Sequence, residues 1–362
     1  MDLDFWKNKK VLITGNTGFK GSWLCLFLQN LNVNIVGYSL PPPTEPSLFK
    51  LAALDKSVKT FYEDVRDFEK LKKVLLEEKP EIVIHMAAQP LVRYSYKNPI
   101  ETYSTNVMGT VNVLEAARYC DSLRAIVVVT SDKCYENKEW IWSYRENEPM
   151  GGYDPYSNSK GCAELVVSAY RNSFFNLNDY QKHGVALASA RAGNVIGGGD
   201  WSEDRLIPDI MKSLLQNEKP IIRNPEAIRP WQHVLEPLCG YLLLAQKLYE
   251  SKGKFAEAFN FGPVDEDAKP VSWIVDKLCK MWGANIEWVV DGADQAHEAA
   301  YLKLDSSKSR SVLGWKSRLN LEITLNWIVA WYKKLAIGED IRFFSLEQVK
   351  IYQEFKYVTE KN

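Results

Sequence analysis

Short apolar runs alternate with amphipathic stretches through the first half of the chain. The run at residues 125–129 is too uniformly apolar for a half-exposed strand and fits a strand that is covered on both faces, whereas the stretches between the runs have a helical period. The predicted strands are 11–13, 34–38, 82–84, 125–129 and 185–188, and the predicted helices are 21–31, 68–78, 103–119 and one that starts near residue 156. Such an alternation predicts an α/β fold, with a doubly wound parallel sheet and right-handed crossovers.

The pattern changes after about Gly197. Short apolar pieces alternate there with proline-containing loops, and several tryptophans appear. We therefore predict two domains. Residues 1–196, with short returning segments from the C-terminal half, would form the sheet domain, and residues 197–362 would mainly form a smaller mixed α/β domain that holds the substrate.

Charge and composition exclude several classes of protein. Lys and Arg number 45 against 46 Asp and Glu, a net charge of -1, so nucleic acid is not an expected partner. No run approaches the ~20 apolar residues that cross a bilayer, so no membrane is expected. The acidic N-terminus and six singly spaced cysteines favour a cytoplasmic protein, and four histidines without ligand spacing argue against a metal.

A glycine-rich segment follows the first predicted strand. It reads Thr-Gly-Asn-Thr-Gly-Phe-Lys-Gly over residues 14–21, and its glycine spacing differs from the common Gly-x-Gly-x-x-Gly. Glycine lets a backbone turn tightly against a pyrophosphate, and a helix N-terminus supplies free N–H groups. We predict the cofactor loop of a Rossmann-type domain, with these candidate residues: Gly15, Thr17, Gly18, Phe19, Lys20 and Gly21.

The end of the second predicted strand does not settle which dinucleotide binds. An acid there would hold the ribose of NAD, but the chain reads Gly-Tyr-Ser-Leu over residues 37–40, without an acid or an arginine. Asp64 and Val65 are candidates for an adenine contact. The alternative, with equal weight, is that Asp64 is an ordinary loop carboxylate exposed to solvent. The choice between NAD and NADP stays open at this point.

Two polar groups point to proton chemistry. Tyr156 and Lys160 lie four residues apart, on one face of a predicted helix, and a nearby ammonium is expected to lower the pKa of the phenol. Ser131 belongs to a polar cluster, residues 130–133, that closes the apolar strand 125–129. Ligands bind at such strand ends in doubly wound sheets, so Tyr156 is a candidate proton acceptor for a hydroxyl under oxidation.

These motifs together resemble the extended short-chain dehydrogenase/reductase family, over roughly residues 8 to 335. The resemblance rests on the following segments: 14–21, 85–89, 105–110, 130–133, 156–160, 191–197, 229–231 and 304–315. It implies NAD as the cofactor and adds Ala87, Ala88, Gln89 and Asn106 to the cofactor site. It also implies a homodimer in which the helices that carry Asn106 and Tyr156 pair as a four-helix bundle.

Two residues narrow the resemblance to the nucleotide-sugar 4,6-dehydratases. Epimerases of this family usually have small, non-acidic residues where this chain has Asp132 and Lys133. Most dehydratases have an acid at the first position and Glu at the second. Lys133 departs from that pattern. The combination of Lys133 with the segments 18–21 and 198–201 resembles the sequences of the branch that acts on CDP-glucose. The alternatives are a dTDP- or GDP-sugar dehydratase, a 4-epimerase, and a dinucleotide-sensing regulator without turnover.

The resemblance implies a role for each candidate. Tyr156 would take the C4 hydroxyl proton, Ser131 would bind the C4 oxygen, Lys160 would hold the cofactor ribose, and Asp132 would protonate the C6 hydroxyl. Lys133 would remove the C5 proton, position the base, or orient Asp132. The substrate nucleotide would be held by Asn194, Arg205, Arg223, Arg229 and Tyr301, with surface ion pairing as the alternative for Arg205 and Arg223. The product would serve the synthesis of dideoxyhexoses for lipopolysaccharide.

Overall fold

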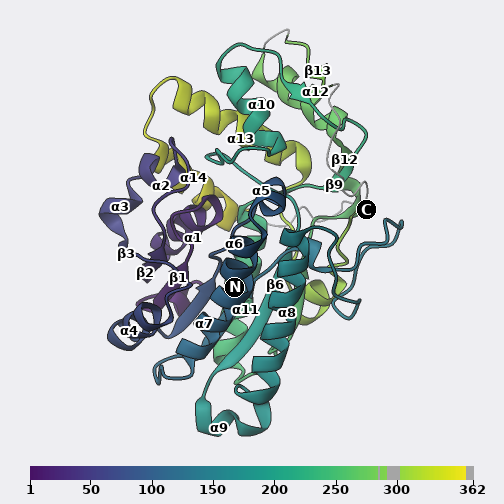
Figure 1. Cartoon of the computed structure of the whole chain (residues 1–362). Helices are drawn as coiled ribbons and strands as arrows, with labels where there is room; N and C mark the ends of the chain where they lie inside the picture. The colour runs from purple at the N-terminus through teal and green to yellow at the C-terminus, as the bar shows by residue number, and fades with distance from the viewer. Residues whose placement is uncertain (284–285, 292–301, 356–362) are drawn as a thin grey trace, which may run out of the picture.

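A seven-stranded parallel sheet forms the centre of the molecule (Figure 1), in a computed structural model that describes residues 1–283, 286–291 and 302–355. Its strand order is β11-β6-β5-β4-β1-β2-β3, and every pair is parallel. The strands are β1 (Lys10–Thr14), β2 (Asn34–Ser39), β3 (Lys59–Tyr62), β4 (Ile82–His85), β5 (Ala125–Val129), β6 (Ala186–Ala192) and β11 (Ala258–Phe261). The predicted α/β fold with a doubly wound parallel sheet is confirmed.

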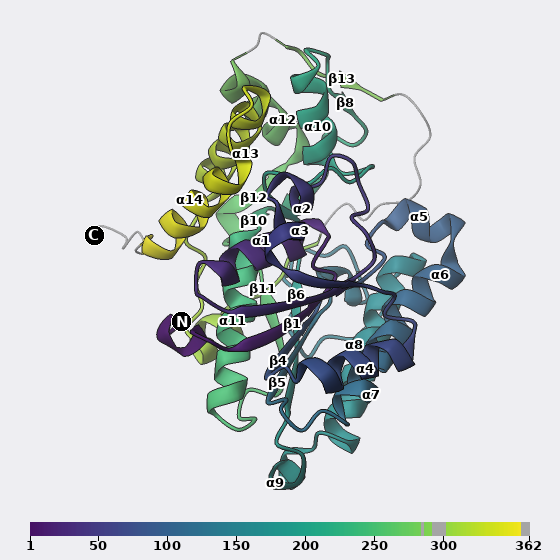
Figure 2. The ribbon, with the colours of Figure 1, turned by 90° about the vertical axis from the view of Figure 1, so that its left-hand side faces the viewer.

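Helices cover both faces of this sheet (Figure 2). The helices of the described residues are α1 (Phe19–Gln29), α2 (Leu48–Leu51), α3 (Leu54–Ser57), α4 (Phe68–Glu78), α5 (Val92–Lys97), α6 (Pro99–Tyr103), α7 (Gly109–Ala117), α8 (Pro155–Ser173), α9 (Tyr180–His183), α10 (Leu206–Leu215), α11 (Leu235–Glu250), α12 (Val271–Trp282), α13 (Leu321–Ala336) and α14 (Ile341–Glu354). Helices α4, α7 and α8 cover one face, and α1 and α11 cover the other.

Alternate strand residues feed two separate hydrophobic cores. Val11 and Val127 belong to the core beneath α1 and α11, whereas Leu12 and Ile126 belong to the core beneath α4 and α7. Successive strand side chains point to opposite faces, so a sheet covered on both sides needs apolar residues at every position. All five residues of β5 are buried, as the sequence predicts.

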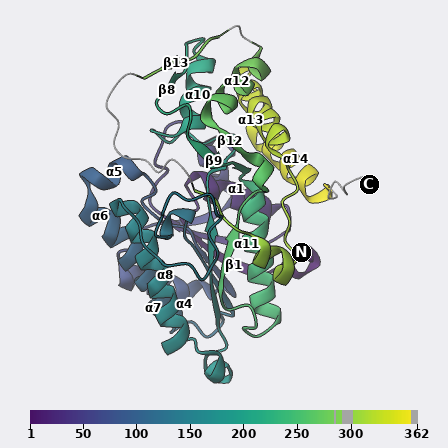
Figure 3. The same ribbon diagram turned by 90° about the vertical axis from the view of Figure 1, so that its right-hand side faces the viewer.

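Smaller elements gather beyond the carboxyl ends of the strands (Figure 3). They include α10, α12 and the two-residue and three-residue strands β7 (Val195–Ile196), β8 (Ile221–Ile222), β9 (Ile228–Pro230), β10 (Gln232–His233), β12 (Ala268–Pro270) and β13 (Val289–Val290). The short 3-10 and π segments are η1 (Asp4–Trp6), η2 (Ser104–Met108), η3 (Asp132–Cys134), η4 (Leu177–Asp179), η5 (Asp265–Asp267) and η6 (Ser309–Leu313). Among the described helices, none is long and apolar enough to span a membrane.

Two predicted elements differ from the observed ones in ways that matter for the site. The strand predicted to end at residue 188 continues to Ala192, because the polar Ser189 and Arg191 are buried against Glu164. The helix predicted over 103–119 is a composite of α6, the π-helical η2 and α7. It starts earlier, at Pro99, a residue whose fixed φ suits the first turn of a helix.

Candidate active site

The glycine loop lies between β1 and α1, where the strand order reverses between β1 and β4. Gly15 has φ +77°, and a Cβ there would lie 2.8 Å from the Ala87 backbone. A Cβ on Gly21 would lie 2.1 Å from the Gly15 carbonyl oxygen. Gly18 is the N-cap of α1 and has no side-chain cap, and a Cβ there would meet only the Gly15 oxygen, at 3.5 Å. The loop therefore leaves open space in front of an uncapped helix N-terminus, which suits a pyrophosphate.

Thr17 and the Asp64–Val65 pair lie near the end of β2, away from the polar cluster after β5. The Thr17 hydroxyl donates to the Leu40 carbonyl (2.8 Å) and lies 2.7 Å from the Ser39 hydroxyl, so Thr17 anchors the loop. The Asp64 carboxylate is bound by Arg66, whose hydrogen bonds outweigh burial and lower the Asp64 pKa. Val65 is buried. The adenine contact predicted for this pair stays a prediction.

Asn106 lies in the π-helical segment η2 and fixes the loop that follows β4. Its side-chain oxygen accepts from the Gln89 amide (2.8 Å), and its Nδ2 donates to the Gln89 carbonyl (3.1 Å) and to Ser159 (2.8 Å). A π-turn re-aims a helical side chain, and such turns are frequent at functional sites. Asn106 therefore fixes the backbone of Gln89 and joins it to α8.

The polar cluster at the end of β5 brings Ser131, Asp132 and Lys133 together. Ser131 donates to the Asp132 carboxylate (2.9 Å) and accepts from the Lys133 amide (3.2 Å). Asp132 is buried, and burial raises its pKa despite the nearby charges of Lys133, Arg229 and Lys20. A carboxyl group with a raised pKa is suited to donate a proton.

Helix α8 presents Tyr156 and Lys160 beside this cluster. Asp154 caps the helix by accepting from the Ser157 amide (2.9 Å), so that Tyr156 lies in the first turn. Burial raises the Tyr156 pKa to about 12, although the Ser131 hydroxyl opposes the shift. The predicted lowering of the Tyr156 pKa is therefore wrong for the protein alone. Lys160 donates to the Val129 carbonyl (3.3 Å), and its own pKa falls to about 8, chiefly because it is buried.

A buried ion pair stands behind the cluster. Glu164, one turn after Lys160, accepts from Thr130 (2.5 Å), Ser189 (2.7 Å) and Arg191 (2.8 Å), and thus joins α8 to β5 and β6. Arg191 also donates to the Tyr135 hydroxyl (2.7 Å). Thr130, which directly follows β5, and Lys160 on α8 are therefore held at a fixed spacing.

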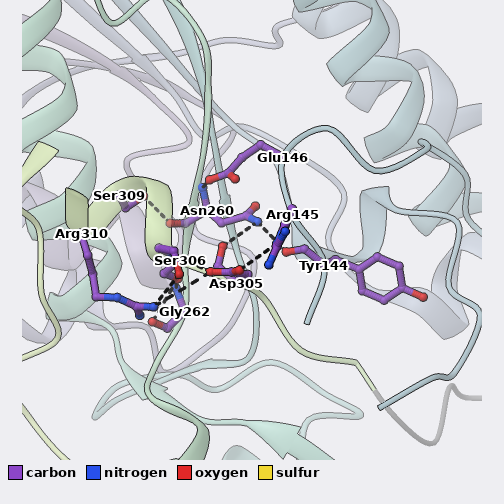
Figure 4. A network of polar contacts seen from close by, with 10 residues as sticks. Tyr144, Arg145, Glu146, Asn260, Gly262, Asp305, Ser306, Ser309 and Arg310 are labelled. Atoms are coloured by element: carbon purple, nitrogen blue, oxygen red, sulfur yellow. Dashed lines mark hydrogen bonds and ion pairs between the residues drawn. The ribbon is translucent and has the colours of Figure 1, made fainter. Parts of the chain in front are cut away.

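The same network continues into the C-terminal half. Tyr135 donates to Asn260 (2.8 Å), at the end of β11, and Asn260 donates to the carbonyls of Tyr144 (2.9 Å) and Asp305 (3.2 Å). Figure 4 shows the two contacts that Asn260 makes with Tyr144 and Asp305, and it also shows the ion pair of Arg145 with Asp305, at 3.1 Å. Asp305 lies in the segment 304–315, one of the segments on which the family resemblance rests. In the structure this segment has a structural role, because it supports the loop that follows Asp132.

Four of the five residues predicted to hold the nucleotide line a cavity of about 290 Å³ in front of the cluster. Asn194, Arg205, Arg223 and Arg229 all line it, together with Ser131, Asp132, Lys133 and Tyr156. The Asn194 Nδ2 is buried without a hydrogen-bond partner in the described structure, so it is available to a ligand oxygen. Tyr301 lies outside the described residues.

Two of these arginines are paired within the protein. Arg205 binds Asp200 at 3.0 Å and Arg223 binds Asp204 at 2.8 Å. The ion pairing that the sequence left as an alternative is thus present, and both residues also line the cavity. A bound diphosphate would share these arginines with the aspartates.

Sequence reasoning missed three residues of the site. A Cβ on Gly193 would lie 2.6 Å from the Asp132 Oδ2, so this glycine makes room for the carboxylate. Glu164 gave no signal, since a Glu on a helix is ordinarily solvated. Asp200 appeared within a glycine motif, but its pairing with Arg205 could not be read from spacing.

Comparisons with known proteins identify the family of this chain. The family model described as GDP-mannose 4,6 dehydratase matches residues 12–326. A CDP-glucose 4,6-dehydratase of Salmonella typhimurium is 58% identical over 352 residues, which cover 97% of this chain and 98% of that protein. A dTDP-glucose 4,6-dehydratase of Shigella flexneri is 25% identical and covers 89% of this chain and 92% of its own length.

Solved structures share the fold at lower identity. UDP-glucose 4-epimerase of Thermotoga maritima, solved with UDP-glucose, has a TM-score of 0.78 at 21% identity and covers 90% of this chain and 99% of its own. dTDP-glucose 4,6-dehydratase of Bacillus anthracis, in complex with NAD, has a TM-score of 0.73 at 22% identity. The match covers 92% of this chain and 99% of that protein. The family match and the 58% identical relative confirm the resemblance found in the sequence. This chain belongs to the nucleotide-sugar dehydratase family that the GDP-mannose 4,6-dehydratase model describes.

Proposed function

We propose that this chain is an NAD-dependent CDP-glucose 4,6-dehydratase, a hydro-lyase that converts CDP-glucose to CDP-4-keto-6-deoxyglucose and water. The observation that carries the proposal is the 58% identity, over nearly the whole of both chains, to a protein with that activity. The buried Asp132 agrees with it, because an elimination needs a proton donor for the departing hydroxyl and an epimerisation does not.

The cofactor site fits a dinucleotide. The uncapped start of α1 and the open side of Gly18 would take the pyrophosphate, and Lys160, beside the β5 end, would hold the nicotinamide ribose. Ala87, Ala88 and Gln89, held by Asn106, would form the wall next to the glycine loop. NAD held there would supply the hydride chemistry of the reaction, the oxidation at C4 of the sugar and the reduction at C6.

The protein side chains move the protons. Tyr156 would take the proton of the C4 hydroxyl while Ser131, which already interacts with Tyr156, binds the C4 oxygen. The ketone makes the C5–H acidic. Asp132 would then protonate the C6 hydroxyl, which leaves as water, while a basic group in the same cavity takes the C5 proton; the sequence offers Lys133 for that step. Asn194 and Arg229 would bind the diphosphate.

A single incubation tests the proposal. CDP-glucose with a catalytic amount of NAD should lose one water, seen as product mass and as the alkaline absorbance of a 4-keto-6-deoxy sugar, without net NADH. dTDP- and GDP-sugars in parallel should react more slowly. A product of unchanged mass with inverted C4 would establish an epimerase, and no change with any sugar nucleotide would favour a non-catalytic regulator.

We further propose a cytoplasmic homodimer whose product feeds the synthesis of dideoxyhexoses for lipopolysaccharide. The dimer rests on α6, α7 and α8, which pack together and leave Ile100, Met108 and Leu165 more than half exposed. Apolar side chains on neighbouring helices suit a four-helix bundle between two copies. Light scattering should give twice the mass of 41.5 kDa, and Leu165→Asp should shift it to the monomer.

A further inference from the structure

Lys20, which the sequence assigned to the cofactor loop, faces the catalytic cavity. It is the second residue of α1 and lines the same cavity as Ser131, Asp132 and Tyr156. The residue as a whole is partly exposed, but its charged end is buried. Within the described residues its ammonium group makes no hydrogen bond and no ion pair, so Nζ is available to a ligand.

The charges around Lys20 come from three other segments. Arg205 and Lys160 repel its positive charge, whereas Asp132 and Asp200 attract it. Asp200 is already bound by Arg205 (3.0 Å) and by the Ser202 amide (3.1 Å), which weakens its pull on Lys20. Asp132, whose own pKa is raised, is the other of these two acids.

These surroundings make Lys20 a weaker base than an ordinary lysine. Burial, with Arg205 and Lys160, lowers its pKa to about 7. A lysine accepts a proton only in its neutral form, and an amine with this pKa is neutral in roughly half of the molecules near pH 7. Paired groups with oppositely shifted pKa values, here Asp132 and Lys20, are typical of an acid and a base that act in one step.

We infer that Lys20 takes the C5 proton of the 4-keto intermediate; this inference rests on the proposed function and names the base in its elimination step. The C5–H bond breaks and its proton passes to Lys20 Nζ. The electron pair forms the C5–C6 double bond, and the C6–O bond breaks. Asp132 gives its proton to the departing hydroxyl, which leaves as water.

Lys133 then has a different task. It lies in η3, between the catalytic cavity and a second cavity lined by Tyr135 and Asp154, and its amide is bound by Ser131. Among the neighbouring charges, Lys133 has the largest effect in lowering the Asp132 pKa. This matches the alternative in which Lys133 orients Asp132 and adjusts its acidity.

The test separates C5 deprotonation from cofactor binding and from C4 oxidation. Lys20→Ala, Lys20→Arg and Lys133→Ala would be compared with the wild type, with Lys73→Ala as a control at an exposed site on α4. The measurements are NAD affinity, NADH absorbance after mixing with CDP-glucose, product formation at saturating NAD, and the isotope effect with CDP-glucose deuterated at C5.

For Lys20→Ala we expect near-normal NAD affinity, accumulation of NADH, a larger C5 isotope effect, and product formation reduced by about 10²-fold or more. Small primary amines should restore part of the rate, and Lys20→Arg should fail because guanidinium stays protonated. A defect that disappears at saturating NAD would overturn the inference, as would a rate within a few-fold of wild type. The inference would also be overturned if Lys133→Ala, and not Lys20→Ala, accumulated NADH and showed the larger C5 isotope effect. A wild type inactive on CDP-glucose would instead refute the proposed function.

Discussion

Replacing Glu164 with Gln should destabilise the protein strongly. Both side chains of the Glu164–Arg191 pair are about one-twentieth exposed. The Gln amide oxygen can still accept from Thr130 or Ser189, so the main loss is the charge that faces Arg191. Breaking a buried pair by removing one partner costs about 3–5 kcal/mol of unfolding free energy, because the other charge stays buried.

Urea unfolding at neutral pH measures this loss. Glu115→Gln on α7 is the matched control, since the Glu115–Arg118 pair is partly exposed and should contribute less than about 1 kcal/mol. Replacing both Glu164 and Arg191 with Met should recover much of the stability, because neither charge of the pair is then left buried without its partner. A loss below about 1 kcal/mol in Glu164→Gln would refute the reasoning.

The direction in which pH changes the stability difference between wild type and Glu164→Gln follows from the Glu164 pKa. Burial would raise the Glu164 pKa, but Arg191 and the two hydroxyl donors outweigh it and lower the pKa below 4.5. A group with a lowered folded pKa stabilises the fold above its unfolded pKa and loses that contribution as the pH falls through the folded value. The difference between wild type and Glu164→Gln should therefore be constant from neutral pH to about 5 and shrink in acid.

Three further outcomes are expected. Asp132→Asn should oxidise C4 and accumulate NADH but form product about 10²-fold more slowly or less, and normal turnover in a product assay would contradict the proton-donor role. Gly193→Ala should reduce elimination in the same assay with little loss of thermal stability, because its Cβ would lie 2.6 Å from the Asp132 carboxylate. Burial lowers the pKa of His85 and of His233 to about 3 each, so the unfolded chain binds more protons below about 6.5 and the urea midpoint should fall between pH 7 and pH 5. His85→Gln should make that fall shallower, and an unchanged slope would contradict the assignment.

Much of the fold follows from local sequence pattern. The strand 125–129 and the helix 68–78 have the observed bounds, because one is uninterrupted apolar sequence and the other ends before a proline. The extension of β6 was missed since its polar residues are buried against a partner on α8. A pattern of apolar positions carries no signal for such a pair, which forms between segments more than twenty residues apart.

The site divides in the same way. Spacing predicted that Tyr156 and the residues after β5 would meet, because strand ends of a parallel sheet share one edge. It could not predict the Tyr156 pKa, which depends on burial by surrounding segments. Nor could spacing show that the Lys20 side chain reaches the cavity of Asp132, since a lysine in a glycine loop can point either way.

The position of β11 has a consequence for how the protein is made. This strand pairs with β6 and comes from residues 258–261, about 65 residues after β6 ends. Until the ribosome has released that segment, β6 has an unpaired edge, and α11 is not yet in place to cover β5 and β6. The nascent sheet is therefore most prone to aggregation late in synthesis, and a fragment ending at residue 196 should require chaperones or fail to stay dispersed.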